Sequence, residues 1–195
     1  MAKQSWLLTY VRGSRNSKTM RKPIPFAILV LLGIVFDLLT KNLAFSALSP
    51  TTTYVLIPNV LEFVNAKNFG VAFSLLAGFP WFILVVTSGA IVFLIWLYTR
   101  IRETAHGLLI AAIALLLIGA TGNLIDRLFL GYVRDFIDFT PRLPLIGHWA
   151  VFNVADIGIT VGVILFVIAE FFFAPAPEKK TPDEPNQSAE NMPSA

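Results

Sequence analysis

The chain has 195 residues, of which 56% are hydrophobic and 14% are charged, and its mean hydropathy is +0.72. These values lie far above those of an ordinary soluble domain, so the sequence predicts an integral membrane protein. The absence of cysteine excludes disulfides and thiol catalysis. His106 and His148 lack ligand spacing, so we expect no metal site, and we expect no cofactor. The net charge is only +3, and the basic residues are not interleaved with aromatic ones, which excludes nucleic acid as a partner.

Four apolar segments are long enough, or nearly so, to cross a membrane as helices. They lie near residues 25–45, 81–98, 108–125 and 152–173. About 20 helical residues span the roughly 30 Å hydrocarbon core of a bilayer. The first segment has no small-residue cleavage motif after it, so we expect it to remain as an anchor. The sequence therefore predicts an all-α membrane protein with four transmembrane helices, in a membrane domain over residues 24–174.

The flanks of this domain are polar. Residues 1–23 form a basic leader suited to anionic cytoplasmic lipid, and residues 175–195 have the composition of a disordered tail. Lys and Arg gather in the cytoplasmic flanks of membrane helices, which predicts that both termini are cytoplasmic. The basic residues assigned to that side are Lys3, Arg12, Arg15, Lys18, Arg21, Lys22, Arg100, Arg102, Lys179 and Lys180. The outer side then holds Lys41, Lys67, Arg127, Arg134 and Arg142.

Two segments, 46–80 and 126–151, lie outside the membrane in this arrangement. Residues 54–57 and 61–64 are β-prone and are bounded by Pro and Asn, which predicts a short strand pair. We therefore expect a small extracytoplasmic β-containing segment on the membrane surface. The second segment contains 133–138 and several turn-forming residues, and it is predicted as a functional loop.

Two similar motifs place aspartates at the predicted helix ends. Asn123 precedes Asp126 by three residues, and Asn153 precedes Asp156 by three residues, so each amide shares a helix face with its carboxylate. Ionisable groups are costly in a membrane and mark a functional site by default. Two carboxylates that share a site cannot both ionise easily, and one proton divided between them is the working state of an aspartic-protease pair. The two motifs therefore predict an acid–base site.

Structural explanations compete with this hypothesis. Asp156 lies near the start of a helix, where a negative charge is stabilised by the helix dipole. Asp126 and Arg127 are compatible with an interfacial ion pair in which the arginine extends toward the headgroups. Asn68 and Gly70 suit contact with an extended substrate backbone, but the same residues are typical of a turn.

Two charged pairs also have alternative interpretations. Asp37 and Lys41 are spaced i, i+4, so we expect a membrane-embedded pair with a structural role. The alternative is a Lys41 that faces the substrate. Arg134 and Asp135 are typical of a solvated loop pair, but we favour the alternative that Asp135 supports the active site.

The sequence resembles the lipoprotein signal peptidase family, also called signal peptidase II, over about residues 24–173. The resemblance rests on five motifs in the same order along the four predicted spans. These are Asp37-x-x-Thr40-Lys41, Asn68-x-Gly70-x-Ala72-Phe73-Ser74, Gly119-Ala120-x-Gly122-Asn123-x-x-Asp126-Arg127, Val133-x-Asp135-Phe136 and Phe152-Asn153-x-Ala155-Asp156.

This resemblance implies an aspartic endopeptidase of the bacterial inner membrane. Such an enzyme removes signal peptides from prolipoproteins, cutting before the diacylglyceryl-modified cysteine. The resemblance assigns the catalytic pair to Asp126 and Asp156, at the outer face of the membrane. Substrate-binding or site-supporting roles fall to Asn68, Gly70, Asn123, Arg127, Asp135, Asn153, Asp37 and Lys41. We expect lipidated prolipoproteins and membrane lipid as partners, and a monomeric enzyme.

Two functions from other classes are alternatives to a peptidase. A proton-coupled transporter or channel also uses buried carboxylates, but transporter sites usually lie near the bilayer midplane, whereas these aspartates are predicted at one end of the bundle. A non-enzymatic assembly protein is the second alternative. Cleavage of a lipidated prolipoprotein would distinguish a peptidase from both alternatives.

Overall fold

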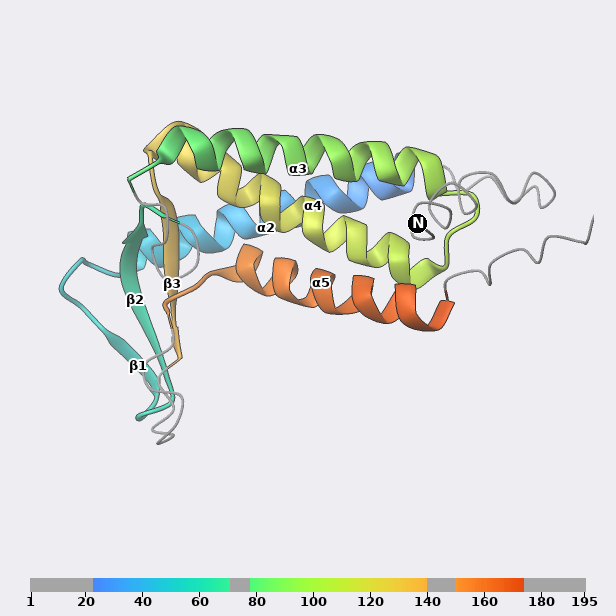
Figure 1. Cartoon of the computed structure of the whole chain (residues 1–195). Coiled ribbons are helices and arrows are strands. Elements are labelled where there is room, and N and C mark those ends of the chain that lie inside the picture. The colour runs from blue at the N-terminus through green and yellow to red at the C-terminus, as the bar shows by residue number, and fades with distance from the viewer. Residues whose placement is uncertain (1–22, 71–77, 140–149, 174–195) are drawn as a thin grey trace, which may run out of the picture.

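Four long helices and one small sheet make up the part of the chain that the structure describes, residues 23–70, 78–139 and 150–173 of a computed structural model. The helices are α2 (Pro23–Ala47), α3 (Pro80–Ile101), α4 (Gly107–Leu130) and α5 (Val154–Phe173). Each is long and apolar enough to cross a membrane. Figure 1 shows the four helices side by side, with the sheet across one end of the bundle. The predicted all-α membrane fold with a small β-containing segment is confirmed.

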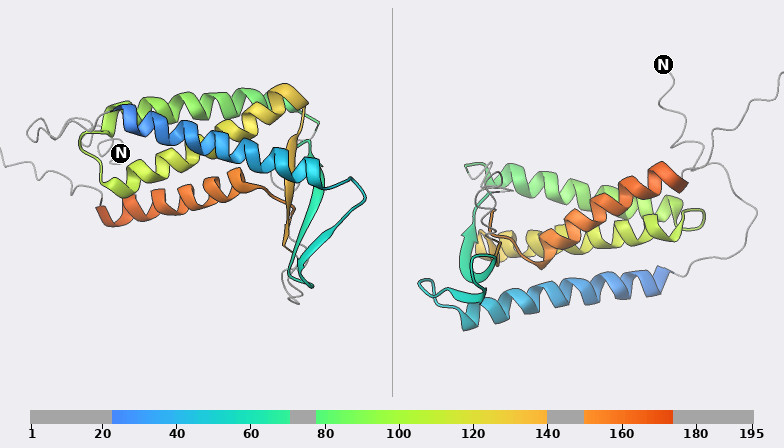
Figure 2. Two further views of the ribbon diagram at one scale, coloured as in Figure 1. Left: turned by 180° about the vertical axis from the view of Figure 1, so that it is seen from behind. Right: turned by 90° about the horizontal axis from the view of Figure 1, so that it is seen from below.

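Helix α4 is the centre of the bundle. It contacts α2, α3 and α5, whereas α3 makes its main helix contacts with α4 alone. Figure 2 shows the same arrangement from behind and from below. Small residues let α4 and α5 approach closely, because a Cβ on Gly119 would contact the carbonyl oxygen of Ala155 and one on Gly162 would lie 2.9 Å from Cγ of Leu116.

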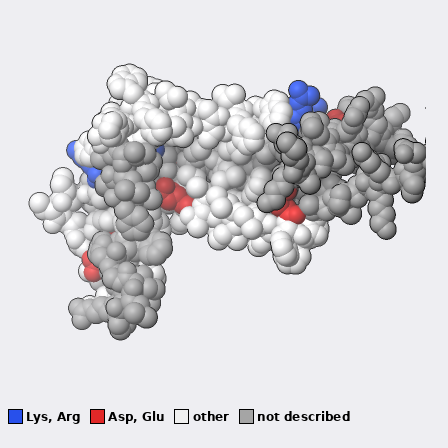
Figure 3. Space-filling view, viewed as in Figure 1, with Lys and Arg blue, Asp and Glu red and all other residues white. Residues whose placement is uncertain are grey.

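The apolar core lies at the end of the bundle opposite the sheet. A stacked pair of rings, Phe26 and Tyr98 with centroids 3.7 Å apart, joins α2 to α3 beside it. The buried residues of this core are Leu97, Tyr98, Ile101, Ala105, Leu109, Ile113, Leu117 and Ala169. In the view of Figure 3, the charged side chains of the described residues appear toward the two ends of the bundle, and the surface between them is uncharged, as the lipid-facing band of a membrane protein should be.

The sheet has three antiparallel strands in the order β1-β2-β3. The strands are β1 (Tyr54–Ile57), β2 (Leu61–Asn68) and β3 (Val133–Phe139). The first two confirm the predicted strand pair, although β2 continues four residues beyond the predicted end. The third strand was predicted as a loop, and that prediction is wrong. Phe152 pairs with Ile137, which ties the segment before α5 to β3.

Helix ends differ from the predicted spans in two places that matter for the site. Helix α4 continues to Leu130 and stops at Gly131, whose φ of +80° is favourable for glycine and typical of a helix C-cap. Asp126 therefore lies within a helix and not just beyond its end. Helix α5 begins at Val154, two residues later than predicted. The described residues do not include the predicted leader up to residue 22, the predicted tail, or residues 71–77 and 140–149 of the outer segments.

Candidate active site

Asp156 lies in the first turn of α5 and forms a reciprocal cap with Asn153. The side-chain oxygen of Asn153 accepts a hydrogen bond from the backbone N–H of Asp156 at 3.1 Å, and Oδ2 of Asp156 accepts one from the backbone N–H of Asn153 at 3.0 Å. This is a capping box built from Asn and Asp. Oδ1 of Asp156 accepts a further hydrogen bond from Nδ2 of Asn123 at 2.8 Å. The helix-end role weighed for Asp156 is therefore present, and it fixes the orientation of the carboxylate.

Asp135 on β3 joins Asp156 through a shared amide. Nδ2 of Asn153 donates to Oδ1 of Asp135 at 2.6 Å, and Nδ2 of Asn68 donates to Oδ2 at 2.9 Å. Asp135 is only 2% exposed. Burial, and after it the negative charge of Asp156, raise the pKa of Asp135 from 3.8 to about 6, although the two amide hydrogen bonds and Lys41 oppose this shift. Two carboxylates whose charges interact unfavourably in a buried site tend to share a proton.

Asp126 on α4 has different surroundings. Nη2 of Arg134 lies 2.7 Å from its Oδ1, Nε lies 3.2 Å from both oxygens, and the backbone N–H of Arg134 donates to Oδ2 at 3.0 Å. Nζ of Lys41 is 3.7 Å from Oδ2. Arg134 also donates through Nη1 to the side-chain oxygen of Asn42. Two cations thus neutralise Asp126, and Asn123, predicted to accompany it, is turned to Asp156 instead.

Asp37 and Lys41 form the ion pair expected from their spacing. Nζ of Lys41 lies 2.7 Å from Oδ2 of Asp37, and both side chains are fully buried. Lys41 also donates to Oδ1 of Asn123 at 2.9 Å, and Oδ1 of Asp37 accepts from the backbone N–H of Ala155 at 2.9 Å. The pair therefore connects α2 to α4 and to the first turn of α5. A Cβ on Gly122 would contact the Asp37 carboxylate, so only glycine leaves room for this arrangement.

Arg127 contacts the chain just after β2 and does not form an ion pair with Asp126. Its Nη2 donates to the carbonyl oxygen of Gly70 at 2.5 Å, and its Nη1 donates to the carbonyl oxygen of Asn123 at 3.4 Å. The backbone N–H of Gly70 in turn donates to Oδ1 of Asn68 at 2.9 Å. The turn considered for Asn68 and Gly70 is thus present, and it brings Arg127 beside the carboxylates. The buried Nε of Arg127 has no hydrogen-bond partner among the described residues.

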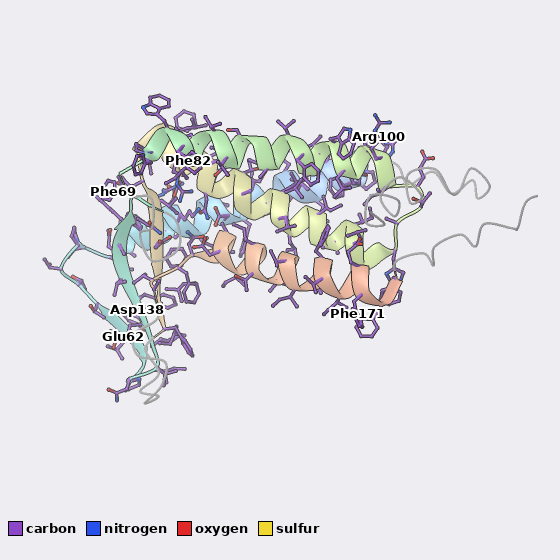
Figure 4. The ribbon with its side chains drawn as sticks, in the orientation of Figure 1. Glu62, Phe69, Phe82, Arg100, Asp138 and Phe171 are labelled. Atoms are coloured by element: carbon purple, nitrogen blue, oxygen red, sulfur yellow. The ribbon has the colours of Figure 1, made fainter. Side chains whose placement is uncertain are left out.

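A cavity of about 680 Å³ opens beside these groups, between α3, α4 and α5. Its wall is mainly apolar, and its charged and amide side chains lie where α4 and α5 approach the sheet. The lining residues are Asn68, Val86, Thr87, Ala90, Ala120, Asn123, Arg127, Val133, Ala150, Val151, Phe152, Asp156, Ile157, Ile159, Thr160 and Val161. Such an apolar pocket with a few convergent polar groups is typical of a ligand site. Figure 4 shows Phe69 and Phe82 at the sheet end of the bundle and Arg100 at the opposite end of α3.

Every sequence-predicted site residue lies at the sheet end, and Lys41 and Asn123 connect Asp126 to Asp156 within one buried network. Asp156 lines the cavity, whereas Asp126 and Asp135 are both absent from its wall and are 1% and 2% exposed. Sequence reasoning missed Arg134 and Asn42, because their link to Asp126 depends on the placement of β3 and α2, and no local spacing signals it. Among the described residues, no group of three His, Asp or Glu side chains is placed to hold a metal ion.

Comparisons with known proteins agree on one family. The family model described as signal peptidase (SPase) II matches residues 29–172. A lipoprotein signal peptidase from Sinorhizobium fredii is 35% identical over 161 residues, covering 80% of this chain and 92% of the relative. One from Hydrogenovibrio crunogenus is 39% identical over 161 residues, covering 78% of this chain and 88% of the relative. A solved bacterial membrane enzyme structure, obtained by the in meso method at 2.3 Å resolution, is 30% identical, with a TM-score of 0.67, and covers 80% of this chain and 94% of that one.

Proposed function

The chain belongs to the signal peptidase II family, and we propose that it is a multi-pass membrane aspartic endopeptidase that removes signal peptides from prolipoproteins. The finer proposal concerns the catalytic pair. We assign it to Asp156 and Asp135, in place of the Asp126 and Asp156 expected from the sequence. The observation that carries this assignment is that Asp135 and Asp156 share Asn153 and interact electrostatically, whereas Asp126 is neutralised by Arg134 and Lys41.

The proposed chemistry follows from this pair. With one proton between them, the ionised carboxylate accepts a proton from a water molecule, and the protonated one donates to the scissile carbonyl. General acid–base assistance of this kind contributes about 10²–10⁴-fold. Asp135 suits the acid role, because burial and Asp156 favour its protonated form. The proton belongs to the pair, so pH profiles will report apparent values for both groups.

The substrate proposal rests on the cavity wall. A mainly apolar space beside Asp156 suits a lipid-modified peptide, and we propose that cleavage occurs before a diacylglyceryl-modified cysteine. Lipid recognition would act mainly by placing the scissile bond, since a misplacement of about 1 Å can cost roughly 10²-fold in rate. Lipidated and unmodified forms of one preprolipoprotein, compared in the same proteoliposomes, test this point. Equal cleavage rates would remove the lipid requirement and leave the peptidase.

The proposed orientation places the sheet and the carboxylates outside and both termini in the cytoplasm. It rests on the excess of Lys and Arg in the flanks assigned to the cytoplasm. Single cysteines at Asn59, in the turn between β1 and β2, and at Arg102, after α3, can be labelled in intact cells with a membrane-impermeant reagent. We expect labelling at 59 alone. Labelling at residue 102 alone would show that the protein has the opposite orientation in the membrane.

The catalytic pair is tested by matched aspartate-to-asparagine variants. We expect Asp135→Asn and Asp156→Asn to lose at least about 10²-fold in turnover per folded molecule, since each removes a group that transfers a proton. Glu103→Gln, at the exposed end of α3, is the control and should retain wild-type turnover. An active Asp135→Asn variant would refute the assignment of Asp135. If Asp126→Asn were then inactive while fully folded, the pair expected from the sequence would be supported.

A further inference from the structure

Arg134 connects three elements of the site. Its guanidinium and its backbone N–H both contact the carboxylate of Asp126 on α4, and its Nη1 donates to Asn42 on α2. The side chain of Arg134 is only 12% exposed. A planar guanidinium that reaches both oxygens of one carboxylate fixes geometry as well as charge. The first half of β3 is therefore attached to the helix bundle at a defined rotation.

The neighbouring residue on β3 is Asp135. Successive side chains of a strand point to opposite faces, so the contact that holds Arg134 against Asp126 turns Asp135 toward Asn68 and Asn153. A rotation of the strand would move both side chains together. Arg134 thus controls where the Asp135 carboxylate lies relative to the first turn of α5.

Arg134 also balances the charge of the buried cluster. Four carboxylates and three cations from α2, α4, β3 and α5 face this region, so the cluster is neutral when one carboxylate holds a proton. On β2, the Lys67 ammonium lies 4.9 Å from the Tyr132 ring centroid, and Glu62 and Asp138 face each other in the sheet register farther along the strands. The charged groups of the cluster are Asp37, Asp126, Asp135, Asp156, Lys41, Arg127 and Arg134.

We propose that Arg134 is a positioning residue that fixes β3 through Asp126, so that Asp135 meets Asp156, and whose charge keeps this pair at one proton. The proposal rests on the assignment of Asp135 to the catalytic pair. It also gives Asp126 a structural role, as the carboxylate on α4 to which Arg134 binds. Loss of the Arg134 charge leaves excess negative charge in the cluster, which favours binding of a second proton and removes the general base.

Two substitutions separate position from charge. Arg134→Lys keeps the positive charge but loses the planar guanidinium that contacts both oxygens of Asp126. We therefore expect kcat to fall about 10-fold with little change in KM and no shift of the acid limb of the pH profile. Arg134→Gln loses both, so kcat should fall about 100-fold and the acid limb should move to higher pH. Arg102→Gln removes a partly exposed arginine just after α3 and is the matched control, with wild-type kinetics expected. Wild-type kcat and pH limbs in both Arg134 variants would overturn the proposal.

A double variant keeps the test decisive if Arg134→Gln does not fold. Arg134→Gln with Asp126→Asn replaces the ion pair by a neutral amide pair, so we expect the acid limb to return to the wild-type pH while kcat stays about 10-fold low. Wild-type kcat in the double variant would refute the positioning role, and an acid limb that stays displaced would refute the charge role. Failure of the proposed catalytic pair is distinguishable, because it appears as activity in Asp135→Asn, whatever the Arg134 variants do.

Discussion

Replacing Lys41 by Met tests whether the buried polar network stabilises the helix bundle. Methionine preserves most of the side-chain length and removes the ammonium group. In the wild type this group lies 2.7 Å from Asp37, 2.9 Å from Asn123 and 3.7 Å from Asp126. The substitution leaves the Asp37 carboxylate buried, with the Ala155 N–H as its remaining hydrogen-bond donor among the described residues.

The expected loss is large because the pair is fully buried. Breaking a buried ion pair by removing one partner costs about 3–5 kcal/mol, since the remaining charge is left without compensation. The measurement is the free energy of unfolding in one fixed mixed-micelle system, from reversible denaturant titration. The double variant Lys41→Met with Asp37→Asn removes the orphaned charge, so it should recover part of the loss. A coupling energy between the two sites then isolates the pair.

A matched control comes from the partly exposed pair just after α3. Arg102 lies 3.7 Å from Glu103, with side chains 29% and 50% exposed, so Arg102→Gln should change the free energy of unfolding by less than about 0.5 kcal/mol. If Lys41→Met changed it by less than about 1 kcal/mol, the buried pair would not be a major stabilising contact. A double variant no more stable than Lys41→Met would show that the orphaned Asp37 charge is not the cause of the loss.

The value of kcat/KM should fall as the pH rises through about 6, because Asp135, whose pKa is raised to about 6, must carry its proton to act as the acid. Asn68→Ala removes a hydrogen bond that lowers this pKa, so it should move this fall in kcat/KM to higher pH. A flat profile from pH 5 to about 8 would contradict this. The raised pKa of Asp135 also means that the folded chain binds more protons than the unfolded one between pH 3.8 and about 6. The free energy of unfolding should therefore decrease as the pH rises through that window. Asp135→Asn should abolish this pH dependence, as measured by denaturant titration at a series of pH values. Gly122→Ala places a methyl group against the buried Asp37 carboxylate and should lower the free energy of unfolding by about 1–3 kcal/mol, whereas Gly89→Ala, with open space around it, should not; equal effects would refute the steric reasoning.

The membrane fold was predictable because it depends on local composition. Four apolar runs of sufficient length imply four spanning helices whatever their packing, and all four are present. The ends were less predictable. The charges at Asp126 and Arg127 suggested that the third helix had ended, yet α4 continues to Leu130, since cations from other elements compensate Asp126 and the Gly70 carbonyl accepts a hydrogen bond from Arg127. A helix can carry charges this deep only when distant segments compensate them.

Strand β3 was missed for a related reason. Its sequence mixes charged and apolar residues without strict alternation, so it lacks the period-two pattern of a strand and resembles a solvated loop when the partners are unknown. In the structure, Asp135 is buried against amides from β2 and from the residue before α5. Arg134 is held by α4 and α2. The charged residues that make the strand look polar are therefore the ones that form its tertiary contacts. A single sequence does not show which residues those contacts involve.

The choice between Asp126 and Asp135 shows the same limit more sharply. Asn123 and Asp126 repeat the spacing of Asn153 and Asp156, which made the two motifs look like equivalent halves of one site. The equivalence fails because Asn123 donates to Asp156 across the helix interface, while Asp126 accepts from Arg134. Spacing on one helix says which residues share a face, but the partner on that face belongs to another element.

The division of the bundle into two ends explains how it holds so many buried charges. The apolar core, with Leu97, Ile101, Leu109 and Ile113 among its members, lies away from the sheet and contributes mainly apolar packing. The sheet end carries the carboxylates, the cations and the cavity. Stabilising contacts at one end thus offset electrostatic strain at the other, a distribution expected where function requires groups that weaken the fold. Substitutions that strengthen the core should therefore raise stability without changing the pH profile of cleavage.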